Sequence, residues 1–109
     1  VGPKVQDDLF DILLRFRKFN IVLTADIAKM YRQINVKPVQ RDLQRILWRF
    51  DETKPIEHYQ LNTVTYGTAS ASFLATRCLK QVSIDMRPVS EEISKIIDTG
   101  FYVDDLITG

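Results

Sequence analysis

Two adjacent carboxylates near the end of the chain are the residues best suited to chemistry. Asp104 and Asp105 lie between the apolar stretch 101–103 and a second apolar stretch that begins at residue 106. β-forming residues on both sides of a short polar pair predict a hairpin with the acids at or near its turn. Carboxylate oxygens are the ligands that Mg²⁺ and other hard cations prefer. An Asp pair is equally typical of a solvated turn, so local chemistry leaves both interpretations open.

A third carboxylate stands far upstream, at Asp26. It ends the apolar run 21–25, which is too continuous for a half-exposed strand and predicts a buried central strand. A fold that brings Asp26 beside Asp104 and Asp105 would form a three-carboxylate cluster. Such a cluster can hold two metal ions about 3.5–4 Å apart, which stabilise the attacking and leaving oxygens of a phosphoryl transfer.

Patterns along the rest of the chain predict the elements that must position these acids. Helices are expected where apolar residues recur at helical spacing, and a hairpin where they alternate. The expected helices cover residues 7–18, 69–86 and 90–98, with a short helical segment at 38–44 and a hairpin of 45–50 with 57–65. Helices mixed with antiparallel strands favour the α+β class, with helices packed on one face of an antiparallel sheet.

Three blocks in a fixed order carry a resemblance to a known family. They are DIAKMYRQI at residues 26–34, TVTYGTASASFL at 63–74 and YVDD at 102–105. These blocks resemble motifs A, B and C of the reverse transcriptases of LTR retrotransposons, most closely the BEL/Pao type, and the similarity covers nearly the whole chain. The resemblance implies an RNA-directed DNA polymerase with a right-hand polymerase palm and part of the fingers.

The resemblance also assigns a metal-binding role to residues of motifs A and C. Asp26 and Asp104 would bridge two Mg²⁺ ions, or Mn²⁺ in their place, and Asp105 would belong to the same catalytic group. The main-chain carbonyl of Ile27 would bind the metal on the nucleotide side. The implied reaction is transfer of a nucleotide from a dNTP to a primer 3′-hydroxyl on an RNA or DNA template.

Four further residues would contact substrate by the same resemblance. Tyr31 stands at the position of a steric gate against the ribose 2′-hydroxyl, which argues against an RNA-dependent RNA polymerase. Tyr66 and Gly67 would line the incoming nucleotide, and Tyr102 would face the primer end. Ser72 departs from the family, which usually has proline at the start of this helix.

Length, charge and cysteine content set outer bounds on the protein. A chain of 109 residues suits one domain, and a formal charge of +1 is a weak attraction for nucleic acid. Cys78 is the only cysteine, which excludes an internal disulfide, and its place on an apolar helical stripe predicts burial. No apolar run approaches the length of a membrane-spanning helix, so no membrane association is expected.

The resemblance implies that residues 1–109 form one incomplete palm and partial-fingers domain, truncated within the motif C hairpin. The remaining fingers, the thumb and an RNase H would come from a longer polyprotein in a cytoplasmic retroelement particle. We expect this segment alone not to polymerise DNA. The alternative is an inactive retroelement-derived relic, or a fragment that binds nucleic acid or protein.

Overall fold

The computed structural model describes all 109 residues and combines helices with two antiparallel sheets. The α+β class expected from the sequence is confirmed. The elements, in chain order, are α1 (Leu9–Phe16), β1 (Leu23–Asp26), the 3₁₀ segments η1 (Met30–Gln33) and η2 (Pro38–Gln44), β2 (Arg45–Trp48), β3 (Glu57–Gln60), α2 (Ala71–Met86), α3 (Glu91–Gly100), β4 (Phe101–Tyr102) and β5 (Asp105–Thr108). No helix is both long enough and apolar enough to cross a membrane.

The first sheet has the strand order β1-β5-β4, so the last strand of the chain lies in the middle. The prediction of a buried central strand at residues 21–25 is therefore wrong. β1 is an edge strand, all four of its residues are exposed, and Leu23 keeps 60% of its surface accessible. An unbroken apolar run does not reveal which neighbours a strand will have, and here β1 pairs on one side only.

Two helices pack against this sheet and fix its position. α1 and α3 both contact β5, and Ile12 of α1 is only 1% exposed. The Arg15 guanidinium of α1 donates a hydrogen bond of 3.0 Å to the Thr99 carbonyl of α3. Gly100 ends α3 where a Cβ atom would meet Leu106 of β5 at 3.0 Å, so the helix comes close to the sheet.

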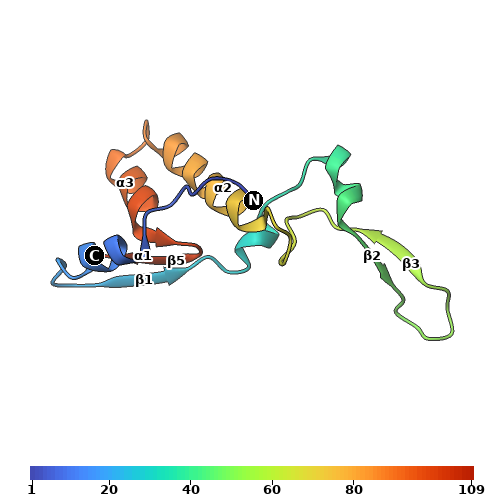
Figure 1. Cartoon of the computed structure of the whole chain (residues 1–109). Coiled ribbons are helices and arrows are strands. Elements are labelled where there is room, and N and C mark those ends of the chain that lie inside the picture. The colour runs from blue at the N-terminus through green and yellow to red at the C-terminus, as the bar shows by residue number, and fades with distance from the viewer.

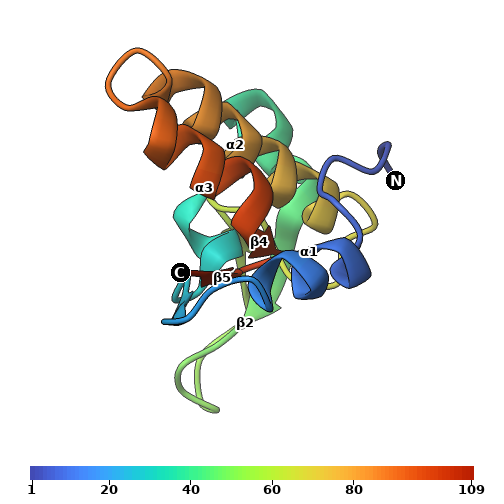
Figure 2. The same ribbon diagram turned by 90° about the vertical axis from the view of Figure 1, so that its left-hand side faces the viewer.

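α2 and α3 form an antiparallel pair that is visible in two views (Figures 1 and 2). The buried Ser83 and Ser94 lie where the two helices meet. The Ser83 hydroxyl donates to the Ser94 carbonyl at 2.9 Å, and the Ser94 hydroxyl donates to the Ser83 carbonyl at 2.7 Å. The buried side of α2 is otherwise made of small residues such as Ala71 and Ala75. Cys78 is exposed, so its predicted burial is wrong, because the helix turns its alanines and Ser83 inward.

The second sheet is an arm made of β2 and β3, which projects away from the rest of the molecule (Figure 1). The hairpin expected here is confirmed, although its second strand ends at Gln60. The rings of Trp48, Phe50 and Tyr59 pack edge to face with centroids 5.9–6.2 Å apart. This aromatic face stays largely open to solvent, since Phe50 is 84% exposed.

Three side chains with shifted pKa values, Asp42, Asp51 and Tyr59, belong to the arm and its base. A hydrogen bond from Arg45, helped by Gln60, lowers the pKa of Asp42 below 3.8. The backbone N–H and hydroxyl of Thr53 lower the pKa of Asp51 in the hairpin loop. The phenol of Tyr59 donates to Glu57, which raises the Tyr59 pKa above 10.0. These local bonds stabilise the shape of the arm.

Candidate functional site

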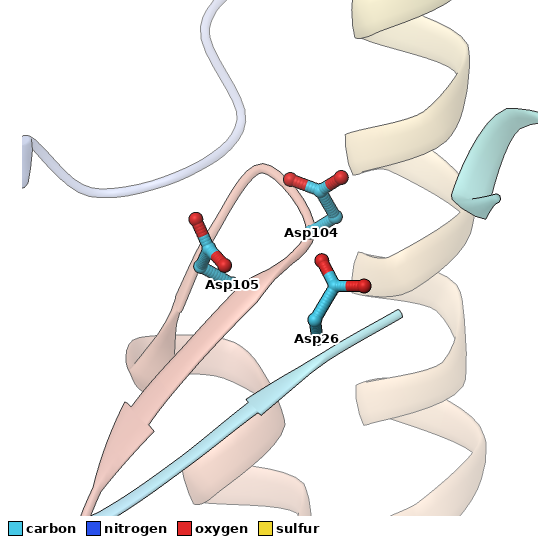
Figure 3. A group of neighbouring side chains, drawn as sticks. All are labelled: Asp26, Asp104 and Asp105. Carbon is cyan, nitrogen blue, oxygen red and sulfur yellow. The ribbon is translucent and has the colours of Figure 1, made fainter. Parts of the chain in front are cut away.

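The sheet register brings the distant Asp26 and Asp105 together. Asp26 of β1 lies directly opposite Asp105 of β5, and directly opposed residues of an antiparallel pair share one face of the sheet. Asp104 occupies the turn between β4 and β5. One carboxylate oxygen from each of the three residues lies within 4.8 Å of the others. Figure 3 shows the three side chains gathered at the end of β1 and around the hairpin turn.

No cation of the protein neutralises this carboxylate cluster. The four ion pairs of the chain all involve other acids, and Asp26 and Asp105 are exposed while Asp104 is half-buried. Three negative charges at such distances repel one another. The donor set consists only of carboxylate oxygens, which suits Mg²⁺ or Mn²⁺ and not the softer metals that prefer thiolates.

Space for a ligand adjoins two of the acids. An open pocket of about 390 Å³ is lined by residues 24–26 of β1 and 105–107 of β5, so Asp26 and Asp105 both border it. Its remaining lining is largely apolar. A metal bound by the carboxylate cluster would therefore be reachable from solvent along the face of the sheet.

The turn that carries the acids has an unusual backbone. Val103 has a φ of +57°, and Asp104, the other central residue of the turn, has no positive φ. A positive φ at the first central residue only is the pattern of a type II′ turn, where glycine is preferred. For a β-branched residue this conformation costs about 1–3 kcal/mol, so other contacts must hold the turn.

Two such contacts reach the turn from outside the hairpin. The Ile27 N–H, directly after β1, donates to the Asp104 carbonyl at 3.0 Å. The side-chain amide of Gln6 accepts a hydrogen bond from the Val103 N–H at 2.8 Å and donates to the Val103 carbonyl at 3.4 Å. Sequence reasoning missed Gln6, because no local pattern indicates a partner at the opposite end of the chain.

Ile27 was expected to offer its carbonyl to a metal by resemblance. That carbonyl accepts a hydrogen bond of 3.1 Å from the Met30 N–H at the start of η1. A carbonyl oxygen has two lone pairs, so one acceptor site remains. The Ile27 backbone thus lies next to the carboxylate cluster, and its N–H is hydrogen-bonded to the Asp104 carbonyl.

The residues expected to contact a nucleotide meet in a second group. The rings of Tyr31 and Tyr66 lie edge to face with centroids 4.6 Å apart, and the Arg32 guanidinium lies 6.0 Å from the Tyr66 ring. Gly67 has a φ of +84°, which other residues rarely adopt, and no atom lies within 4 Å of the position that a Cβ atom would take there. The need for glycine here is therefore conformational.

Tyr102 and Ser72 both line a different pocket. This open space of about 270 Å³ lies between the first seven residues, the start of α2 and the β4–β5 turn. Tyr102 is 40% exposed and pairs with Asp105 across the hairpin. Ser72 lies in the first turn of α2, where a backbone N–H lacks a helical partner and proline is tolerated. Serine in place of proline therefore leaves the helix intact.

The arrangement as a whole combines an open cluster of three carboxylates that could hold a metal ion, two neighbouring tyrosines and open pockets. The three carboxylates come from two strands and a turn of one sheet. Comparison of the chain with protein-family models, with curated protein sequences and with solved structures finds no match in any of the three.

Proposed function

We propose that this chain is the catalytic core segment of a reverse transcriptase of the BEL/Pao type. The observation that supports this most directly is the convergence of Asp26 with Asp104 and Asp105 at one end of one sheet. These acids come from the two blocks that resemble polymerase motifs A and C. If these short blocks resembled the motifs only by chance, their acids would not need to lie close together in the fold.

The proposed reaction is nucleotide transfer from a dNTP to a primer 3′-hydroxyl on an RNA or DNA template. Asp26 and Asp104 would hold two Mg²⁺ ions, with Asp105 in the same group and the Ile27 carbonyl as a further oxygen ligand. Bound there, the metal pair would supply Lewis acidity that activates the hydroxyl and offsets charge developing on the phosphate. Mn²⁺ could replace Mg²⁺, because it also prefers oxygen ligands.

The two tyrosines would select the sugar of the incoming nucleotide. A side chain excludes a 2′-hydroxyl by steric clash only if it cannot move aside. The edge-to-face contact with Tyr66 restricts the Tyr31 ring in this way. Tyr31 would then exclude a ribose 2′-hydroxyl. Gly67 would line the nucleotide site with Tyr66, and Tyr102 would face the primer end from the strand that precedes the acids.

The same proposal assigns the first sheet, with α1 and α3 against it, to a polymerase palm and the arm to part of the fingers. The remaining fingers, thumb and RNase H would belong to the parent polyprotein, in a cytoplasmic retroelement particle. The 109 residues alone are expected not to polymerise DNA, because template and triphosphate would lack most of their binding surface.

The deciding experiment is primer extension on an RNA template by the full-length parent protein in Mg²⁺. Asp104→Asn should lower dNTP incorporation by about 10³-fold or more, since metal stabilisation of the transition state is worth several kcal/mol. Asp11→Asn, which changes an exposed acid of α1, is the matched control and should leave the rate unchanged.

Two results would contradict the proposal. Equal rates for Asp104→Asn and the wild-type parent would remove the carboxylate cluster from the mechanism. No incorporation by a folded wild-type parent would reject the active enzyme and leave the alternative of an inactive relic or a binding fragment.

A further inference from the structure

We infer that Gln6 is a positioning residue for the carboxylate cluster, because its side-chain amide holds the turn that presents Asp104 and Asp105. This inference rests on the proposed metal-binding function. The contact joins the lead-in segment before α1 to the hairpin at the other end of the chain. The hydrogen bonds of the Gln6 side chain go to the Val103 backbone and not to either acid, so its effect on the acids passes through that backbone.

The side-chain amide of Gln6 bonds to both backbone groups of Val103, which have no partner in the strand ladder. Val103 is a central residue of a two-residue hairpin turn, outside the ladder of β4 and β5. Gln6 supplies both missing partners, with an acceptor 2.8 Å from the Val103 nitrogen and a donor 3.4 Å from its carbonyl oxygen. A primary amide carries an acceptor oxygen and a donor nitrogen on the same carbon, so one glutamine side chain can serve both backbone groups.

The conformation of Val103 explains why the turn needs the two hydrogen bonds from Gln6, which together we call the Gln6 clamp. Its φ of +57° is disfavoured for a β-branched side chain, and glycine would adopt it without penalty. Released from Gln6, the turn would move toward negative φ at Val103. The next residue is Asp104, so that movement would redirect a carboxylate of the cluster.

Gln6 is itself held in place by the element that follows it. The neighbouring Asp7 forms an ion pair of 2.6 Å with Arg15, and Arg15 also binds the Thr99 carbonyl. The buried Ile12 anchors the same helix in the core. The clamp therefore has a fixed base, and α1 sets the position of the lead-in segment relative to the hairpin.

The test measures Mn²⁺ binding to the 109-residue chain by the electron paramagnetic resonance signal of the free ion. Gln6→Met keeps the length and bulk of the side chain but removes both hydrogen bonds. It should weaken Mn²⁺ binding about tenfold, as loss of a residue that orients metal ligands does. Gln81→Met, the same change on the exposed side of α2, should leave binding unchanged.

A second variant distinguishes positioning from a general loss of structure. Val103→Gly removes the conformational penalty, so the turn should keep its shape without the clamp. In the Gln6→Met background it should restore Mn²⁺ affinity to within about threefold of wild type. Gln6→Asn, whose amide is too short to reach, should repeat the effect of Gln6→Met if that variant fails to fold.

Amide hydrogen exchange of Val103 provides a readout that needs no metal. Its exchange should be slow in the wild type and at least about tenfold faster in Gln6→Met, because the N–H loses its acceptor. Equal exchange, or equal Mn²⁺ affinity in the two proteins, overturns the inference. A wild-type chain that binds no Mn²⁺ overturns the proposed metal site instead, and Val103 exchange then still decides whether the clamp exists.

Discussion

The residues of the carboxylate cluster lower the stability of the folded chain in the absence of a metal. Asp26, Asp104 and Asp105 place three carboxylates within 4.8 Å of one another, and no Lys or Arg pairs with them. Val103 adds a disfavoured backbone conformation beside them. Strain and repulsion concentrated at one place are typical of functional sites, where geometry is kept at the expense of stability.

Removing one charge of the cluster should therefore stabilise the metal-free chain. Asp26→Asn is expected to raise the free energy of unfolding by ~0.5 kcal/mol, because exposed charges repel only weakly in water. In saturating Mg²⁺ the wild type should have the higher free energy of unfolding of the two proteins, since a ligand that binds only the folded state stabilises it by mass action. Urea denaturation in EDTA and in Mg²⁺ measures both values.

Asp11→Asn is the control for this comparison, because it removes an exposed acid that is not part of the cluster. Its effect should be the same with and without Mg²⁺. A wild-type chain whose stability does not respond to Mg²⁺ would contradict the expected reversal and the metal site on which it depends.

At the scale of elements, the contact between α2 and α3 determines where the hairpin with the acids begins. α3 leads directly into β4, and the paired hydroxyls of Ser83 and Ser94 lie buried at the crossing of the two helices. Small side chains allow the helices to approach closely, and each hydroxyl finds an acceptor there. Ser90 caps the N-terminus of α3, since its hydroxyl accepts a hydrogen bond from the Ile93 N–H.

Substitutions at Ser83 should separate the hydrogen bond from the packing. Ser83→Ala is expected to lower the free energy of unfolding by about 1 kcal/mol, the net value of one hydrogen bond. Ser83→Leu should cost about 2–3 kcal/mol or more, because the added volume must force the helices apart. Thermal or urea unfolding gives both numbers, with the exposed Ser72→Ala as a control. A Leu variant as stable as the Ala variant would show that the crossing is loosely packed.

At the scale of the whole molecule, the chain is extended. Its radius of gyration is 17.8 Å, whereas a compact domain of this length has about 13 Å. The overall extents of 59 × 27 × 25 Å reflect the arm of β2 and β3, which lies apart from the first sheet. Only nine of the 109 residues are buried, and none of them lies in β2 or β3.

The arm and the first sheet should accordingly open independently. A two-stranded hairpin with little burial is marginally stable, so the amides of β2 and β3 should exchange at least about tenfold faster than those of β5. Amide exchange followed by NMR measures this for each strand in one experiment. Equal protection in the arm and in β5 would mean that the chain opens as one cooperative unit.

Local patterns predicted most elements well. Helical spacing located α1, α2 and α3 to within a few residues, alternation located the hairpin of β2 and β3, and apolar runs on both sides of the Asp pair located the hairpin of β4 and β5. Burial was predicted less well. β1 is an exposed edge strand and Cys78 is exposed, because an apolar pattern identifies the side of an element that can be buried but not the partner that covers it.

The amino-acid sequence by itself determined the residue types of the site and the local elements that carry them, because helix and turn preferences act over a few neighbouring residues. It also determined that Asp26 would end a strand and that the Asp pair would lie at a hairpin. The tertiary structure alone decided that β5 lies beside β1, so that Asp26 faces Asp105, and that Gln6 reaches Val103. These contacts join opposite ends of the chain, and they form only when the packing of α1 and α3 on the sheet offsets the entropy of closing such long loops.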